Sequence, residues 1–164
     1  MKTSSIAKYH PKLQGIFGPL DKSEEEYLRG VLAQVDIELS RIAKHFARNS
    51  AGLEMQWNES GQLSIAGYVG VADSESHVVD FIVELWPSWM HEPPARETEW
   101  VVETSIDADC QHVPEHASMD NVFIQQERKR SPESSVDELL NAAHQLAAMA
   151  MNNPIEHWTS KAKS

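Results

Sequence analysis

The chain has 164 residues, of which 41% are apolar, so it has the size of one domain with a core large enough to fold without disulfides or metals. Its 25 acidic and 14 basic side chains give a formal charge of −11, which disfavours binding to nucleic acid and to anionic membranes. Short apolar runs, the lack of an apolar segment after Lys8 and a single cysteine predict a cytoplasmic protein without signal peptide, membrane span or internal disulfide.

Residues 1–22 are expected to form an irregular arm, because prolines and glycines interrupt any regular pattern there. A long amphipathic helix is predicted to follow, and Ser23 with Glu26 has the spacing of a capping box at its start. The pattern ends near Gly52. Apolar residues recur between these limits at steps of three and four, at Leu28, Val31, Leu32, Val35, Leu39, Ile42, Ala43 and Phe46.

The middle of the chain alternates apolar and polar residues in five runs, which predicts five strands. The fourth run extends from about Glu97 to Asp107, and the fifth lies around residues 121–126. Short connections between consecutive strands favour an antiparallel meander. The alternation predicts that five large side chains lie on the helix-covered face: Trp57, Phe81, Val83, Trp100 and Val102.

A second amphipathic helix is predicted to begin after Ser131, with Pro132 in the first helical position. The fold class is therefore α+β: an antiparallel meander of about five strands, with the N- and C-terminal helices packed on one face as a two-layer sandwich. Residues 23–158 are expected to form this single domain, and residues 159–164 a frayed tail.

The fourth predicted strand carries acidic residues on the face away from the core, because even spacing places side chains on one face of a strand. No lysine or arginine lies in residues 51–95, so the preceding strands cannot neutralise this face. Such a face is typical of a solvated surface or of a site for a basic partner, and we favour the partner. The residues are Glu97, Glu99, Glu103 and Asp107, joined by Asp80 and Glu84 if the third and fourth strands pair.

Two tryptophans, Trp86 and Trp89, lie on either side of Pro87 in a proline-containing segment that we interpret as a loop. The segment is either a lid that folds back onto the core or an anchor for a partner, since tryptophan and methionine are enriched where proteins bind one another. In the second case it borders the acidic face at one end.

Cys110, His112 and His116 are ligand types that zinc prefers. One segment cannot complete a closed tetrahedral set from these residues, so we expect no bound metal and no other cofactor. No signature of a catalytic cysteine surrounds Cys110, and the chain has no phosphate-binding glycine loop, nucleophile elbow or zinc-protease motif. Carboxylates on an open sheet face also lack the cleft that acid–base catalysis needs.

These patterns favour a non-enzymatic acidic protein, such as an inhibitor, an immunity protein or a chaperone, that recognises a basic protein surface. Two alternatives remain open. One is a small enzyme or metal-binding protein that uses the Cys110, His112 and His116 segment. The other is a structural or assembly subunit, with a homodimer as one such assembly. Neither nucleic acid nor a membrane is expected as a partner.

Overall fold

The structure is a computed structural model that describes residues 13–60, 64–75, 77–88, 99–110 and 120–160. Its elements follow the order that the sequence predicts, with two additional short helices. They are α1 (Leu13–Phe17), α2 (Lys22–Phe46), β1 (Gly52–Ser60), β2 (Ser64–Ala72), β3 (His77–Pro87), β4 (Trp100–Cys110), β5 (Asp120–Lys129), α3 (Pro132–Met151) and α4 (Ile155–Thr159).

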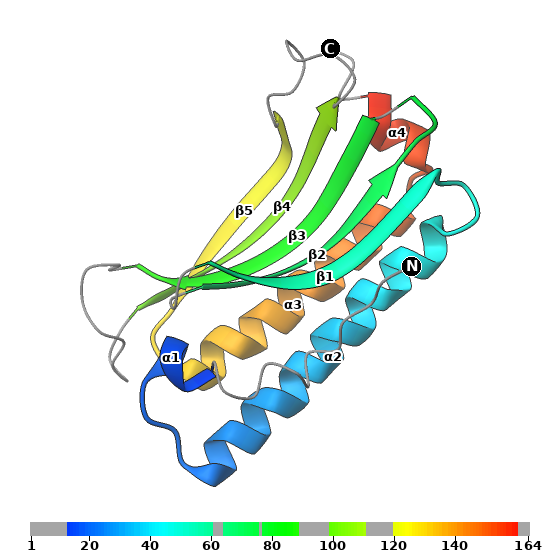
Figure 1. The fold of residues 1–164 in the computed structure, drawn as a ribbon. Coiled ribbons are helices and arrows are strands. Elements are labelled where there is room, and N and C mark those ends of the chain that lie inside the picture. The colour runs from blue at the N-terminus through cyan, green and yellow to red at the C-terminus, as the bar shows by residue number, and fades with distance from the viewer. Residues whose placement is uncertain (1–12, 61–63, 76, 89–98, 111–119, 161–164) are drawn as a thin grey trace.

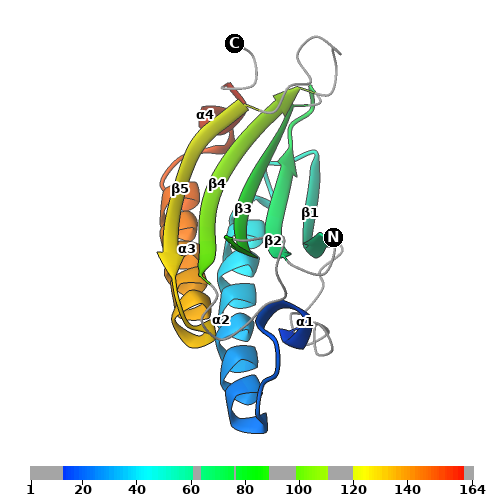
Figure 2. The ribbon, with the colours of Figure 1, turned by 90° about the vertical axis from the view of Figure 1, so that its left-hand side faces the viewer.

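The five strands form one antiparallel sheet in the order β1-β2-β3-β4-β5, and both long helices cover the same face of it (Figures 1 and 2). Helix α2 packs against β1 and β2, helix α3 packs against β3, β4 and β5, and the two helices pack against each other. The predicted α+β sandwich is confirmed. We call the helix-covered side of the sheet the inner face and the opposite side the outer face.

The predicted register is also confirmed. Phe81 and Val83 of β3 are fully buried on the inner face, whereas the residue that follows each of them, Ile82 and Glu84, is only partly buried on the outer face. Trp57, Trp100 and Val102, the other residues predicted beneath the helices, are buried as well. Burial of large apolar side chains on one face supplies the main driving force for closing the two layers.

The start of α2 differs from the prediction. The N-cap is Asp21 and not Ser23: its carboxylate accepts a hydrogen bond from the Glu24 backbone N–H at 2.8 Å, and the Glu24 side chain accepts one from the Asp21 N–H at 3.4 Å. Both aspartate and serine can cap a helix, and each has a glutamate three residues later, so the spacing alone does not choose between them.

The described part of the N-terminal arm contains α1, a helix of five residues in a segment predicted to be irregular. Its apolar side chains supply the reason, because Leu13, Ile16 and Phe17 are all buried in the main core. Burial of these three side chains stabilises a helix that is too short to persist alone in water.

The sheet bends away from α2 and α3 towards both of its ends, which leaves its outer face concave (Figure 1). The short helices occupy the two ends. At one end, the Phe17 ring of α1 lies 5.4 Å from the Trp100 ring, and at the other the Trp158 ring of α4 meets Phe81 edge-on at 5.9 Å. Aromatic contacts on the inner face therefore hold each short helix against the sheet.

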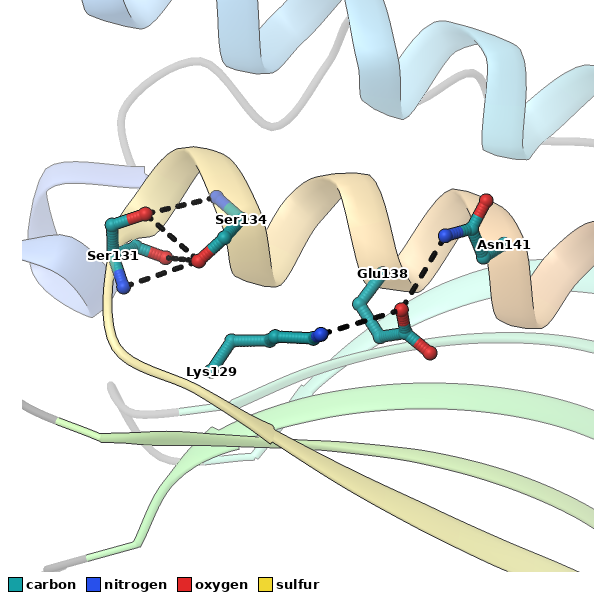
Figure 3. Close-up of polar contacts among 5 residues, drawn as sticks. All are labelled: Lys129, Ser131, Ser134, Glu138 and Asn141. Atoms are coloured by element: carbon teal, nitrogen blue, oxygen red, sulfur yellow. Dashed lines mark hydrogen bonds and ion pairs between the residues drawn. The ribbon is translucent and has the colours of Figure 1, made fainter.

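Helix α3 begins where the sequence predicts, with Ser131 as N-cap and Pro132 in the first turn (Figure 3). The Ser131 hydroxyl accepts a hydrogen bond from the Ser134 N–H at 3.1 Å, and the Ser134 hydroxyl accepts one from the Ser131 N–H at 3.3 Å. Lys129, the last residue of β5, lies 4.0 Å from the Glu138 carboxylate in α3. These contacts fix the turn between the sheet and the helical layer.

Gly67 marks a close approach of α2 to the sheet. A Cβ atom at this position would lie 2.8 Å from Leu39 Cδ1 and 3.0 Å from the Trp57 ring. Both neighbours are buried, so neither has open space to move into. Glycine here lets the helix lie close to the strand.

We expect Gly67→Ala to lower the free energy of unfolding by about 1–3 kcal/mol, because the added methyl group overpacks this contact. Gly52→Ala is the matched control, since the nearest atom to a Cβ there is 3.6 Å away, an ordinary contact distance. Urea unfolding of both variants measures the difference. Equal effects of the two substitutions would contradict the close packing at Gly67.

Candidate functional site

The outer face of β3 and β4 brings four carboxylates together in two cross-strand pairs. Asp80 lies directly opposite Asp107, and Glu84 lies directly opposite Glu103. We call these pairs the aspartate row and the glutamate row. Like charges directly opposite each other destabilise a sheet modestly, so the pairing works against folding.

The rows are separated by an apolar strip across the same face. It runs from Tyr68 in β2 through Ile82 and Ser105 to Ile124 in β5, each opposite the next. Ile124 is 50% exposed, one of the most exposed large apolar side chains in the described part of the chain. Successive rows on one face are about 7 Å apart, so the acidic rows flank the apolar strip at the distance of one side chain.

Small residues of β2 adjoin the acidic side chains. Gly70 is opposite Asp80, and Ala66 is opposite Glu84. A Cβ atom on Gly70 would lie 2.8 Å from Asp80 Oδ1, so the aspartate carboxylate leans over the glycine. Glycine at position 70 therefore leaves room for this carboxylate oxygen.

Asp80 is the most perturbed group on this face. Burial raises the pKa of Asp80 to about 6, and nearby negative charges add to the shift, those of Asp107, Asp109 and Glu54. A raised pKa means that no nearby positive charge of the described residues stabilises the ionised form of this carboxylate. A cation brought by another molecule would supply it.

Glu84 and Asp107 are perturbed in the same direction as Asp80. Burial raises the pKa of Glu84, with further contributions from the charges of Glu103 and Asp107. Burial also raises the pKa of Asp107, with a contribution from Glu103. In the described residues no ion pair involves Asp80, Glu84 or Asp107, so the two rows hold negative charge without a counter-ion.

Of the predicted acidic surface, Glu99 is neutralised by arginines, whereas Glu103 has a hydrogen bond from a neutral amide and keeps its charge. Glu99, which precedes β4, is 3.0 Å from Arg128 and 3.9 Å from Arg130. The Glu103 carboxylate accepts a hydrogen bond from Gln126 Nε2 at 2.8 Å. The prediction considered only the strands before β4, whereas these partners come from and just after β5. Glu97 lies outside the described residues.

Trp86 does not lie in a loop, as the sequence suggested, but in β3, opposite Val101 of β4. The strand tolerates Pro87 because its pairing with β2 ends at Leu85, so the missing N–H falls where β3 has a neighbour on one side only. Trp86 is half-buried on the outer face, two residues beyond the glutamate row. Trp89 lies outside the described residues.

Cys110 is the last residue of β4, and the structure does not describe its side chain. His112 and His116, the other two predicted metal ligands, lie outside the described residues.

A different cluster of potential ligands, which the sequence did not indicate, lies at the turn between β2 and β3. Asp73, Glu75 and His77 each place one potential ligand atom within 4.8 Å of the other two, more closely than any other three such residues described.

The turn itself uses these groups. Asp73 Oδ1 accepts hydrogen bonds from the backbone N–H groups of Glu75 and His77, at 2.8 and 2.9 Å, and His77 Nδ1 lies 2.8 Å from Asp73 Oδ2. Burial works to raise the pKa of Asp73, but these hydrogen bonds outweigh it and hold the pKa below its usual value. We therefore interpret the cluster as a capped turn, for which aspartate two residues before the N–H group is the sequence signal.

In the part of the chain that the structure describes, no helix is both long and apolar enough to cross a membrane. Comparison with family models, curated proteins and solved structures finds no match to this chain. The case for a function therefore rests on the geometry of the outer face.

Proposed function

We propose that the protein is a non-enzymatic binding protein that recognises a basic protein surface with the concave outer face of its sheet. The observation that carries the proposal is the pair of opposed carboxylate rows, Asp80 with Asp107 and Glu84 with Glu103, which stand without a basic partner in the described residues. Clustered like charges weaken folding, so their presence is better explained by what they bind.

The apolar strip between the rows indicates what such a surface would meet. Protein interfaces combine an apolar centre with a charged surround, and charge of one sign speeds encounter with a partner of the opposite sign. Tyr68, Ile82 and Ile124 would contact apolar side chains of the partner, while the rows on either side would contact its lysine and arginine residues. An inhibitor, an immunity protein or a chaperone would each use such a surface, and the single cysteine fits a cytoplasmic location.

The direct test removes the glutamate row without changing its shape. We expect Glu84→Gln with Glu103→Gln to lower the association rate constant for a basic partner, captured from the source cells with the wild-type protein, by about tenfold at low salt. The dissociation rate should change less. The melting temperature should hold or rise, because two opposed charges are gone.

The matched control, Glu26→Gln with Glu156→Gln, removes the same charge from α2 and α4 on the other side of the molecule. Stopped-flow association at two salt concentrations compares the two double variants. Equal loss of association rate in both, or capture of partners that are not basic, would refute the proposed function.

A further inference from the structure

Two carboxylate oxygens in and beside the aspartate row have no hydrogen-bond donor among the described residues. Asp107 is only 6% exposed although it lies on the outer face of the sheet, and its Oδ1 atom is one of the two. The other is the buried Oδ1 of Asp109, two residues further along the same face of β4. Buried polar atoms in proteins are nearly always paired, so two orphaned acceptors side by side indicate a missing donor.

The strand register places Asp80 beside these two aspartates on the outer face. The pairing of β4 with β5 shifts register between Ile106 and Asp107, and such bulges re-aim the side chains beside them. Asp80 is opposite Asp107, and the charge of Asp109 reaches Asp80 strongly enough to perturb it. The three aspartates therefore border one region of the outer face, with Gly70 beside Asp80.

The spacing of the oxygens argues against a single metal ion. Three ligand atoms within 4.8 Å of one another occur in the described residues at Asp73, Glu75 and His77, but not at the three aspartates. A cation that satisfies all three aspartates must therefore be extended and carry several donors. Guanidinium fits this description, because it is planar, keeps its charge at any physiological pH and presents five N–H donors in a fixed fork.

We propose that Asp80, Asp107 and Asp109 form a subsite for one guanidinium group, so that the basic partner is recognised through an arginine side chain in preference to lysine. This inference rests on the proposed function and specifies the chemistry of its partner. Lysine offers a compact ammonium group, which can approach one carboxylate closely but cannot reach donors out to all three.

The test uses two capped peptides of equal length and charge, with arginine at every basic position of one and lysine at every basic position of the other. We expect the full-length protein to bind the arginine peptide about tenfold more tightly at low ionic strength. Asp107→Asn should weaken the arginine peptide by about tenfold and the lysine peptide by only about twofold, which removes most of the preference.

Glu84→Gln is the matched control, because it removes one partly buried charge from the same face in the other row. It should weaken both peptides equally and leave the preference intact. The melting temperature of Asp107→Asn should hold or rise, since a buried unpaired charge is gone. Asp109→Asn gives a second, independent measurement of the same preference.

The outcomes separate the two proposals. Equal binding of both peptides to the wild-type protein, or the same loss of preference in Asp107→Asn and Glu84→Gln, would overturn the arginine subsite and leave the proposed function standing. Failure of the wild-type protein to bind either peptide at low salt would count against both.

Discussion

Phe81→Ala should be the most destabilising single truncation at the centre of the fold, with an expected loss of about 3–5 kcal/mol in the free energy of unfolding. Phe81 is fully buried, stacks on Phe46 of α2 with ring centroids 5.5 Å apart, and meets Trp158 of α4 edge-on. Its removal would leave a cavity where α2, α4 and the sheet meet, and a rigid set of aromatic neighbours cannot close it.

The neighbouring residue supplies the control. Ile82→Ala truncates an apolar side chain of the same strand, but on the outer face, where it is only partly buried. We expect a loss below about 1.5 kcal/mol there, because little area is buried and no closed cavity forms. Chemical denaturation of both variants measures the two losses in the free energy of unfolding. If Ile82→Ala costs as much as Phe81→Ala, the outer face is covered and cannot be a docking surface.

The second large effect is a dependence of stability on pH that is opposite in direction to ordinary acid denaturation. Asp80 has a pKa of about 6 in the folded protein, above the value of about 3.9 for an unfolded chain. The folded state therefore binds more protons between these values, and the free energy of unfolding falls as the pH rises through them. The raised pKa values of Glu84 and Asp107 act in the same direction.

We expect the protein to be more stable at pH 5 than at pH 7.5 by about 2 kcal/mol. The shift at Asp80 alone corresponds to at most about 3 kcal/mol, and solvent access to this partly exposed group reduces it to about 1–2 kcal/mol. The lowered pKa of Asp73 has the opposite effect on stability. Its contribution is lost only at more acidic pH, as the pH falls from the unfolded-state pKa of this residue through its folded-state pKa.

Asp80→Asn isolates the contribution of this residue. The variant should be more stable than the wild type at pH 7.5 by about 1–2 kcal/mol, and it should show a flatter profile, because the amide does not titrate. Urea unfolding at several pH values measures both. A wild-type protein that loses stability between pH 7.5 and pH 5, or a variant with an unchanged profile, would show that Asp80 is not held in an unfavourable environment.

The register and the layers were predictable from the sequence because they depend on periodicity. Steps of three and four residues in α2 and alternation in β3 and β4 leave one arrangement in which Phe81, Val83 and Trp100 are all buried. The same alternation places Asp80 and Asp107 on one face once β3 and β4 pair, whereas their direct opposition depends on the register of the two strands.

The missed features depend on contacts that periodicity does not encode. Asp21 and Ser23 both satisfy the capping pattern, and only the path of the chain before the helix selects Asp21. The ion pair between Glu99 and Arg128 depends on the register of β5, which follows a long connection and includes a shift beside Asp107. A proline such as Pro87 favours a loop for Trp86 on sequence grounds, whereas a strand paired on one side accommodates it.

The meander has a consequence for how the chain assembles. Each strand pairs with the next one in the sequence, so the sheet closes through local steps of low entropic cost, whereas α2 and α3 reach each other only across the whole sheet. During synthesis α3 is made after all five strands. Until it leaves the ribosome, β3 and β4 expose the part of their apolar inner face that α3 covers. The nascent protein is therefore most prone to aggregation just before its last long helix docks.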